Sequence, residues 1–171
     1  LPDNFELYKK TGNFFEDSFT FVTPGYNVRP LDMSGAIGSV QLKKWPKLLQ
    51  GRLDNLKYFR ELFDDVPWLR LQEEKHGESS WFAFGCVLQG SLKGKRAEVI
   101  KAFDDNGIES RPVASGNFLR QPVVKLFRHY DHGNYEGAQE IEENGFWTGN
   151  HSTDCKEGIH KMYTVLKGLA E

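Results

Sequence analysis

The residues best suited to bind a ligand stand in the run Pro24-Gly25-Tyr26-Asn27-Val28-Arg29-Pro30. The side-chain amide of Asn27 can donate to a phosphate oxygen, and the guanidinium of Arg29 can clamp one through two parallel hydrogen bonds. A residue before proline is pushed out of the α region, so Arg29 is expected in extended backbone. The run therefore predicts an anion-binding segment. The alternative is that Asn27 only stabilises the Pro-Gly turn.

A second group of polar side chains begins with Arg111, at the end of an expected strand. The loop beyond it contains Asn117, whose amide can both donate and accept, and Phe118, whose ring can stack on a nucleobase or sugar. A loop fixed to a strand end is a common position for ligand-binding residues. The alternative for Arg111 is an ion pair with Glu109, because residues two apart in a strand share a face.

The other reactive residue types give no site. His129 and His132 are three residues apart, but no third ligand is evident, so we expect no metal. Cys86 lies in an apolar run and is expected to be a small buried hydrophobe. There is no Ser-His-Asp or paired-carboxylate pattern, and no lysine lies in a context that would favour a Schiff base. We therefore expect no catalytic residue in this chain.

Two stretches of the sequence resemble a known family. Tyr26–Arg29, followed by Met33–Lys44 (MSGAIGSVQLKK), resembles the vitamin B6-dependent DegT/DnrJ/EryC1/StrS sugar aminotransferase family. Gly107–Pro112 (GIESRP) and Gly116–Pro122 (GNFLRQP) are similar to one branch of it, the sugar-nucleotide 3-dehydratases. The resemblance covers nearly all of this chain but only the C-terminal part of the family's proteins.

The resemblance implies a cofactor, a partner and a substrate. The cofactor is pyridoxal or pyridoxamine 5'-phosphate, and in the family the residue matching Asn27 reaches its phosphate across a dimer interface. The same role is implied for Asn27, together with a homodimer. The implied substrate is a nucleotide-linked 4-keto-6-deoxyhexose, with these candidate ligands: Phe19, Arg29, Arg111, Asn117 and Phe118. The family's N-terminal domain holds the cofactor ring, so we expect this chain alone to be inactive and not to bind the cofactor.

Three functions stay open at this point. The first is the C-terminal part of a 3-dehydratase, which removes the 3-hydroxyl of the sugar in deoxysugar biosynthesis. The second is a sugar aminotransferase of the same family, and the third is a non-catalytic dimerisation module. In the family a His over the cofactor carbonyl carbon marks the dehydratases and a Lys the aminotransferases. That position would precede Leu1.

The elements that must position these residues follow from hydrophobic spacing. A helix is expected to start near Asp32, as N-cap, and to be interrupted by Pro46, where a second amphipathic helix begins and runs to about Asp65. Residues 79–89 are expected to form a central strand buried on both faces. Shorter strands are expected at 68–72, 108–113 and 146–149, and helices at 95–105, 123–127, 135–144 and from Asp154, where Asp154 and Glu157 resemble a capping box.

The first 23 residues are rich in aromatic side chains without a helical or strand period. We expect them to lie across a missing domain or a partner subunit; the alternative is an arm packed on its own domain. The chain is therefore divided into an interface and active-site arm, 1–30, and a C-terminal α+β domain, 31–171. The implied domain has a mostly antiparallel sheet of three to four strands with helices on one face.

Composition limits the class of protein. The 171 residues are 39% hydrophobic and 27% charged, which suits one globular domain with a real core. No apolar run approaches the ~20 residues of a membrane span, and a net charge of −2 without a basic block argues against nucleic acid. Nothing requires an oxidising compartment, so we expect a cytoplasmic protein. The first residue is Leu1 rather than Met, which suggests a fragment.

Overall fold

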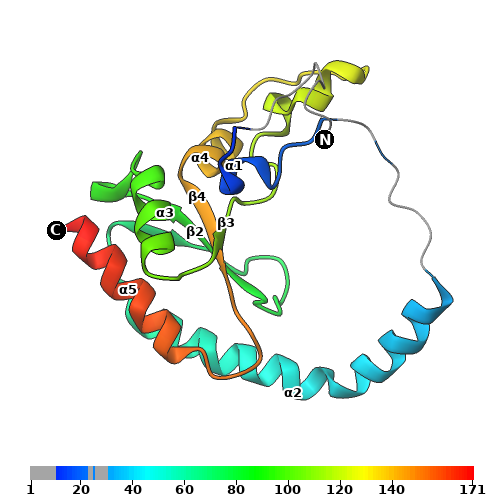
Figure 1. Cartoon of the computed structure of the whole chain (residues 1–171), viewed down its shortest axis with the longest axis vertical. Helices are drawn as coiled ribbons and strands as arrows, with labels where there is room; N and C mark the ends of the chain where they lie inside the picture. Colours follow the sequence, from blue (N-terminus) through cyan, green and yellow to red (C-terminus); the bar gives the residue numbers. More distant parts are fainter. Residues whose placement is uncertain (1–10, 23–24, 26–30) are drawn as a thin grey trace.

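A computed structural model describes residues 11–22, 25 and 31–171. At its centre is a four-stranded sheet in the order β1-β2-β4-β3, and all three neighbouring pairs are antiparallel (Figure 1). The strands are β1 (Leu69–Leu71), β2 (Ala83–Leu88), β3 (Ser110–Arg111) and β4 (Gly145–Gly149). This arrangement confirms the expected small α+β domain.

One face of the sheet carries the core. In β2, Phe84, Cys86 and Leu88 are buried and the residues between them are half-buried, because alternate side chains point to opposite faces. Cys86 is opposite Phe146 of β4, which extends the same face. The expected burial of this strand on both faces is wrong for the second face. Burial also raises the pKa of the Cys86 thiol far above its ordinary value, since a thiolate there would be poorly solvated.

Three helices cover the core face: α2 (Asp32–Phe63), α3 (Arg96–Asp105) and α5 (Lys156–Ala170). Phe59 of α2 stacks on Phe84 with ring centroids 4.1 Å apart, and Phe103 of α3 meets Phe146 edge-on at 5.4 Å. Met162 of α5 is buried and its sulfur accepts from the Thr148 hydroxyl at 3.6 Å. A fourth helix, α4 (Glu136–Asn144), leads directly into β4.

The helix α2 is continuous through Pro46, so the predicted interruption is wrong. A proline in a helix interior removes one N–H, which would otherwise bond to the carbonyl four residues earlier, at Leu42. Leu42 is 71% exposed, so water can satisfy that carbonyl. Every residue from 31 to 47 is exposed, and in Figure 1 this half of α2 projects away from the domain.

The other half of α2 is fixed to the loop before α5 by a buried amide. The Asn55 amide nitrogen lies 2.8 Å from the carbonyl oxygen of Thr153 and 3.0 Å from the side-chain oxygen of Asn150. The Asn55 side-chain oxygen accepts from the Cys155 N–H at 3.0 Å. The two backbones approach so closely that a Cβ on Gly51 would lie 2.0 Å from the carbonyl oxygen of Ser152.

Several element ends differ from expectation. Leu31, not Asp32, is the N-cap of α2, and Asp32 is its first helical residue. At α5 the capping box does not form, because Asp154 accepts from the N–H of Lys156 and Cys155 takes the N-cap position. The strand expected at 108–113 is only the two-residue β3, which ends before Pro112, a residue without an N–H to donate.

A short helix, α1 (Phe14–Asp17), and three 3-10 turns complete the described elements: η1 (Gly90–Leu92), η2 (Phe118–Arg120) and η3 (Pro122–Leu126). The last corresponds to the short helix expected at 123–127. The helix expected at 95–105 is confirmed, and Gly107, with a φ of 67°, lies just beyond its end. None of the helices in the described ranges has both the length and the apolar character that crossing a bilayer demands.

Candidate functional site

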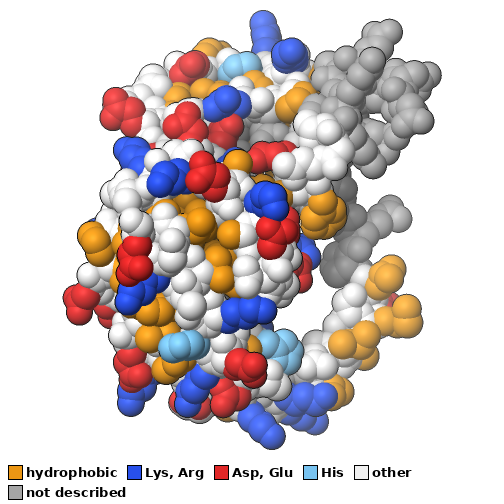
Figure 2. Space-filling view, turned by 60° about the vertical axis from the view of Figure 1, so that its left-hand side comes forward, with side chains coloured by type: hydrophobic (Ala, Val, Ile, Leu, Met, Phe, Trp, Pro, Cys, Tyr) orange, Lys and Arg blue, Asp and Glu red, His pale blue; other side chains and the backbone are white. Residues whose placement is uncertain are grey.

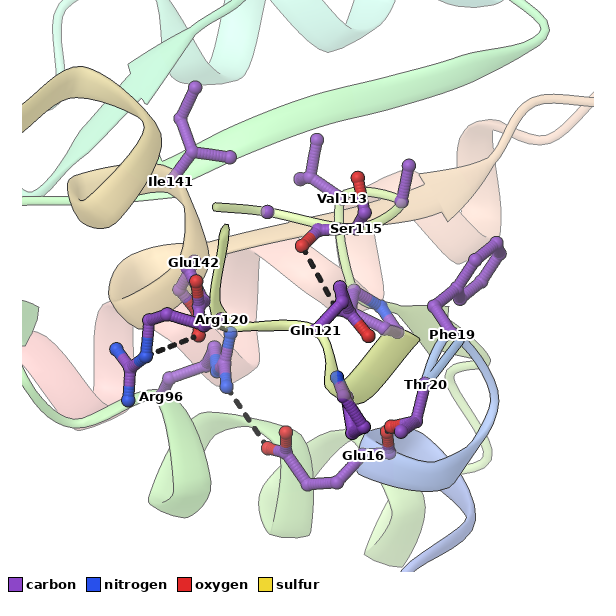
Figure 3. Close-up of a pocket in the computed structure, with 14 residues that line it drawn as sticks. Glu16, Phe19, Thr20, Arg96, Val113, Ser115, Arg120, Gln121, Ile141 and Glu142 are labelled. Carbon is purple, nitrogen blue, oxygen red and sulfur yellow. Dashed lines mark hydrogen bonds and ion pairs between the residues drawn. The ribbon is translucent and has the colours of Figure 1, made fainter. Parts of the chain in front are cut away.

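A pocket of about 270 Å³ lies between the N-terminal segment and the loop after β3. We call residues 11–22 the arm and this cavity the arm pocket. One wall is the loop from Pro112 to Pro122, a second comes from Ile141 and Glu142 of α4, and Arg96 of α3 reaches in beside them. Figure 3 shows Glu16 of the arm facing Arg96, with Phe19 on the opposite side of Gln121. Segments far apart in sequence therefore build this site together.

The loop has an unusual backbone. Ala114 and Gly116 both have positive φ, 43° and 55°, a region that costs an L-residue such as alanine roughly 1–2 kcal/mol. Gly116 is also pressed against α4, since a Cβ there would lie 2.8 Å from the Cβ of Glu142. Strained backbone of this kind is often retained at ligand-binding sites. The tight packing fixes the loop as a rigid wall of the arm pocket.

The charges of the arm pocket are paired across elements. Arg96 forms an ion pair with Glu16 at 3.0 Å, and its other terminal nitrogen donates to the backbone carbonyl of Glu142. The Glu142 carboxylate binds Arg120 Nε at 3.3 Å and accepts from the Asn117 N–H at 2.9 Å. The Arg120 side chain is 55% exposed, so its guanidinium remains accessible to an anion from solvent.

The arm packs on its own domain through two buried side chains. Phe15, in the short helix α1 (Phe14–Asp17), and Val22 are 6% and 7% exposed. The Phe21 N–H donates to the side-chain oxygen of Gln121 at 2.9 Å, and the Val123 N–H donates to the Phe21 carbonyl at 3.0 Å. For these described residues the alternative of an arm packed on its own domain is correct. The predicted ligand Phe19 lines the arm pocket.

Arg111 forms an ion pair with Glu109, which the sequence offered as the alternative to ligand binding. Its Nε and Nη2 donate to one carboxylate oxygen of Glu109 at 3.1 and 2.7 Å. Arg111 is opposite Trp147 in the register and therefore lies on the outer face of the sheet. The pair is half exposed, and such pairs contribute little free energy, so a ligand could displace it. Contact between Arg111 and substrate stays a prediction.

Asn117 and Phe118 lie further along the chain, in the loop that follows Arg111. The Asn117 side-chain oxygen accepts from the Leu119 N–H at 3.2 Å and so caps η2. Its amide nitrogen lies 3.5 Å from a side-chain oxygen of Gln139, and Asn117 lines a separate hollow beside α4. Phe118 is 46% exposed, with its ring 6.3 Å from that of Phe21. Asn27 and Arg29 lie outside the described residues.

Sequence reasoning did not select the charged residues of the arm pocket. Arg120 and Gln121 stand in the GNFLRQP run, only a few residues after Asn117, and that proximity is the one local signal available. Arg96 and Glu142 gave no such signal, because Arg96 binds partners 80 and 46 residues away along the chain. Pairs of that kind become visible only in the fold.

A larger pocket, of about 580 Å³, opens on the opposite side of β3, between the edge of the sheet and α5. Its walls include the core side chains of Phe84, Ile159 and Met162, with Arg52 and Lys161 among its charged residues. None of the predicted ligands that lie within the described residues lines it. Across residues 11–22, 25 and 31–171, no group of three or more His, Cys, Asp or Glu side chains is placed to hold a metal ion.

The lysines show how far the described residues suit a pyridoxal cofactor. A Schiff-base lysine must sit in a walled pocket that lowers the pKa of its amine. Every lysine in the described part of the chain has an exposed side chain. These lysines do not fit that role, so the described residues can form only part of the surroundings of such a cofactor.

The chain belongs to the DegT/DnrJ/EryC1/StrS aminotransferase family, which it matches over residues 3–167. It is 46% identical over 169 residues to GDP-4-keto-6-deoxy-D-mannose 3-dehydratase of Yersinia pseudotuberculosis, which covers 98% of the chain. It is 43% identical over 159 residues, 92% of the chain, to the enzyme of the same name from Escherichia coli O55:H7. The chain spans 43% and 41% of the length of these two relatives.

Solved structures agree with this assignment. The E. coli GDP-4-keto-6-deoxy-D-mannose-3-dehydratase with bound hydrated PLP is similar with a TM-score of 0.74 and 42% identity. The match covers 92% of this chain and 41% of that one. A putative sugar aminotransferase from Streptococcus pneumoniae, Spr1654, shares the fold with a TM-score of 0.69 at 24% identity over 87% of this chain and 38% of that one.

Proposed function

We propose that this chain is the C-terminal portion of a 3-dehydratase that acts on a GDP-linked 4-keto-6-deoxyhexose in deoxysugar biosynthesis. The carrying observation is the 46% identity, over 169 residues, to an enzyme of that name. Family members named as aminotransferases are more distant, at 16–24% identity. A 3-dehydratase named for a dTDP-linked sugar is 25% identical, which favours GDP as the nucleotide here.

The proposal includes a pyridoxal or pyridoxamine phosphate shared with the rest of the protein. When bound, this cofactor supplies an electron sink for breaking the carbon–oxygen bond of the sugar. We assign to Asn27 a hydrogen bond from its amide to the cofactor phosphate. We place the group over the cofactor carbon, which is a His in this branch of the family, outside the described residues.

The substrate part of the proposal assigns the predicted ligands by their chemistry. Arg29 and Arg111 carry guanidinium groups, which suit the two phosphates of a nucleotide sugar. Asn117 suits a sugar hydroxyl, and Phe118 offers a half-exposed ring on which a base can stack. Phe19 supplies an apolar wall at the arm pocket, which excludes water from the substrate there.

We further propose a homodimer and keep the division into an arm, 1–30, and a domain, 31–171. The dimer is supported by the projecting half of α2, where Met33, Ile37 and Val40 are 69%, 62% and 52% exposed on one side of the helix. Both cysteines carry free thiols, which suits the reducing cytoplasm that we propose as the compartment.

The test uses the whole protein that contains this chain. It is incubated with pyridoxamine phosphate and GDP-4-keto-6-deoxymannose, and the sugar product is analysed by mass spectrometry and NMR. We expect a product that has lost the oxygen at C3, and slower turnover of the dTDP-linked sugar. An amino group at C4 with the 3-hydroxyl retained would instead support the aminotransferase. Recovery of unchanged substrate would contradict both.

A further inference from the structure

The arm is joined to the domain at two places. Near its start, Glu16 binds Arg96, and the Arg96 guanidinium carbon lies 5.4 Å from the centre of the Phe15 ring. At its end, Phe21 exchanges hydrogen bonds with Gln121 and Val123. Phe19 stands between Glu16 and Phe21 in the sequence, so the two attachments together fix its backbone beside the arm pocket.

Arg96 is suited to hold the arm rather than to stabilise its own helix. It is the first residue of α3, where a positive charge is opposed by the helix dipole. Yet its side chain is only 16% exposed, and it binds a carboxylate of α1 and a carbonyl of α4 at once. A planar guanidinium can make both bonds while it stacks on a ring, whereas a lysine ammonium lacks that geometry.

We propose that Arg96 is a positioning residue that holds the arm against the domain through Glu16 and so keeps Phe19 at the arm pocket. This inference rests on the proposed function, because that function gives Phe19 its substrate. The Glu16 side chain is 49% exposed, so the ion pair itself adds little to the free energy of unfolding. Its effect is to keep the arm in one place, which raises the effective concentration of the groups it carries.

The experiment compares Arg96→Ala, Glu16→Ala and the double variant in the whole protein. Hydrogen exchange of residues 11–22 reports the arm directly, and the KM for the GDP-sugar reports the position of Phe19. We expect each single variant to exchange about threefold faster in the arm and to raise KM about threefold, as for the loss of one partly exposed ion pair. The double variant should be little worse than Arg96→Ala alone.

A control is available in Lys101 and Asp105, an ion pair of 2.6 Å within the same helix as Arg96. Asp105→Ala should leave the exchange of the arm and the KM unchanged. An equal effect of Asp105→Ala would overturn the inference. So would an unchanged arm in Glu16→Ala, or a released arm with a normal KM. If the whole protein had no dehydratase activity, the proposed function would fail, while the exchange of the arm would still decide whether Arg96 holds it.

Discussion

The two halves of α2 form one continuous helix but lie in opposite surroundings. From residue 31 to 47 every side chain is exposed, and Figure 2 shows hydrophobic side chains gathered on this projecting end. From Gly51 onward the helix is held against the sheet and α5, with Asn55, Phe59 and Phe63 almost inaccessible to solvent. Both halves carry regular apolar spacing. Hydrophobic periodicity therefore identifies a helix, but it does not tell which part of the helix packs within its own domain.

The largest expected effect contrasts an aromatic residue of the packed half with an aliphatic residue of the projecting half. Phe59→Ala removes a ring that is 1% exposed and stacks on Phe84. It should lower the free energy of unfolding by about 3–5 kcal/mol. Leu42→Ala, at a residue that is 71% exposed and on the opposite side of the helix from Met33 and Ile37, should change it by less than about 0.5 kcal/mol. Urea unfolding of both variants measures the difference, and equal losses would show that the two halves are equally packed.

A second contrast uses two glycines of the same helix. Alanine is intrinsically the better helix former by about 1 kcal/mol, so Gly38→Ala should stabilise the projecting half, where a new Cβ meets nothing within 4 Å. Gly51→Ala should destabilise by about 1–3 kcal/mol, because its Cβ would collide with the backbone of Ser152. Helix content by circular dichroism and the unfolding midpoint report the two effects. A higher unfolding midpoint in both variants would contradict the close approach of Gly51 to Ser152.

The smallest effect concerns the thiol beneath the packed half. Because the pKa of Cys86 is raised in the folded protein, the unfolded chain loses this proton first as pH rises. Stability should therefore fall by about 1.4 kcal/mol per pH unit above about pH 8.5, the ordinary thiol pKa. The free energy of unfolding, measured with denaturant at several pH values between 8 and 10, should fall less steeply with pH in Cys86→Ala than in the wild type. Parallel slopes would mean that the thiol ionises without unfolding.

Much of the fold could be predicted from local sequence, for a physical reason. The apolar run that contains β2 and the helical spacing of apolar residues in α3 and α5 each depend on neighbours in the chain. Pro46 misled the prediction because a proline ends a helix only when the lost bond is not offset, and exposure of Leu42 to water offsets it. The capping box predicted at Asp154 does not form, because the Asp154 carboxylate accepts from the N–H of Lys156. Sequence spacing does not determine which of the nearby N–H groups it accepts from.

The candidate site was less predictable than the fold. Phe19 was selected from the family resemblance and the loop after Arg111 by residue type, and the structure places Phe19 in the arm pocket. It also pairs Arg111 with Glu109 and directs Asn117 toward α4, so these two do not form one cluster. The Arg96–Glu16 and Arg120–Glu142 pairs were missed, because each joins residues brought together only by the packing of α1, α3, α4 and the loop.

The buried amide of Asn55 has a consequence for how the protein is made. Its partner Asn150 lies 95 residues further along the chain. At roughly 5–20 residues per second, a ribosome needs about 5–20 s to add that stretch. Late in this interval Phe59 and Phe63 have left the ribosome, but β4 and α5 have not yet emerged from it. The nascent chain therefore presents these rings unprotected, and we expect chaperones to bind the packed half of α2 before the domain can close.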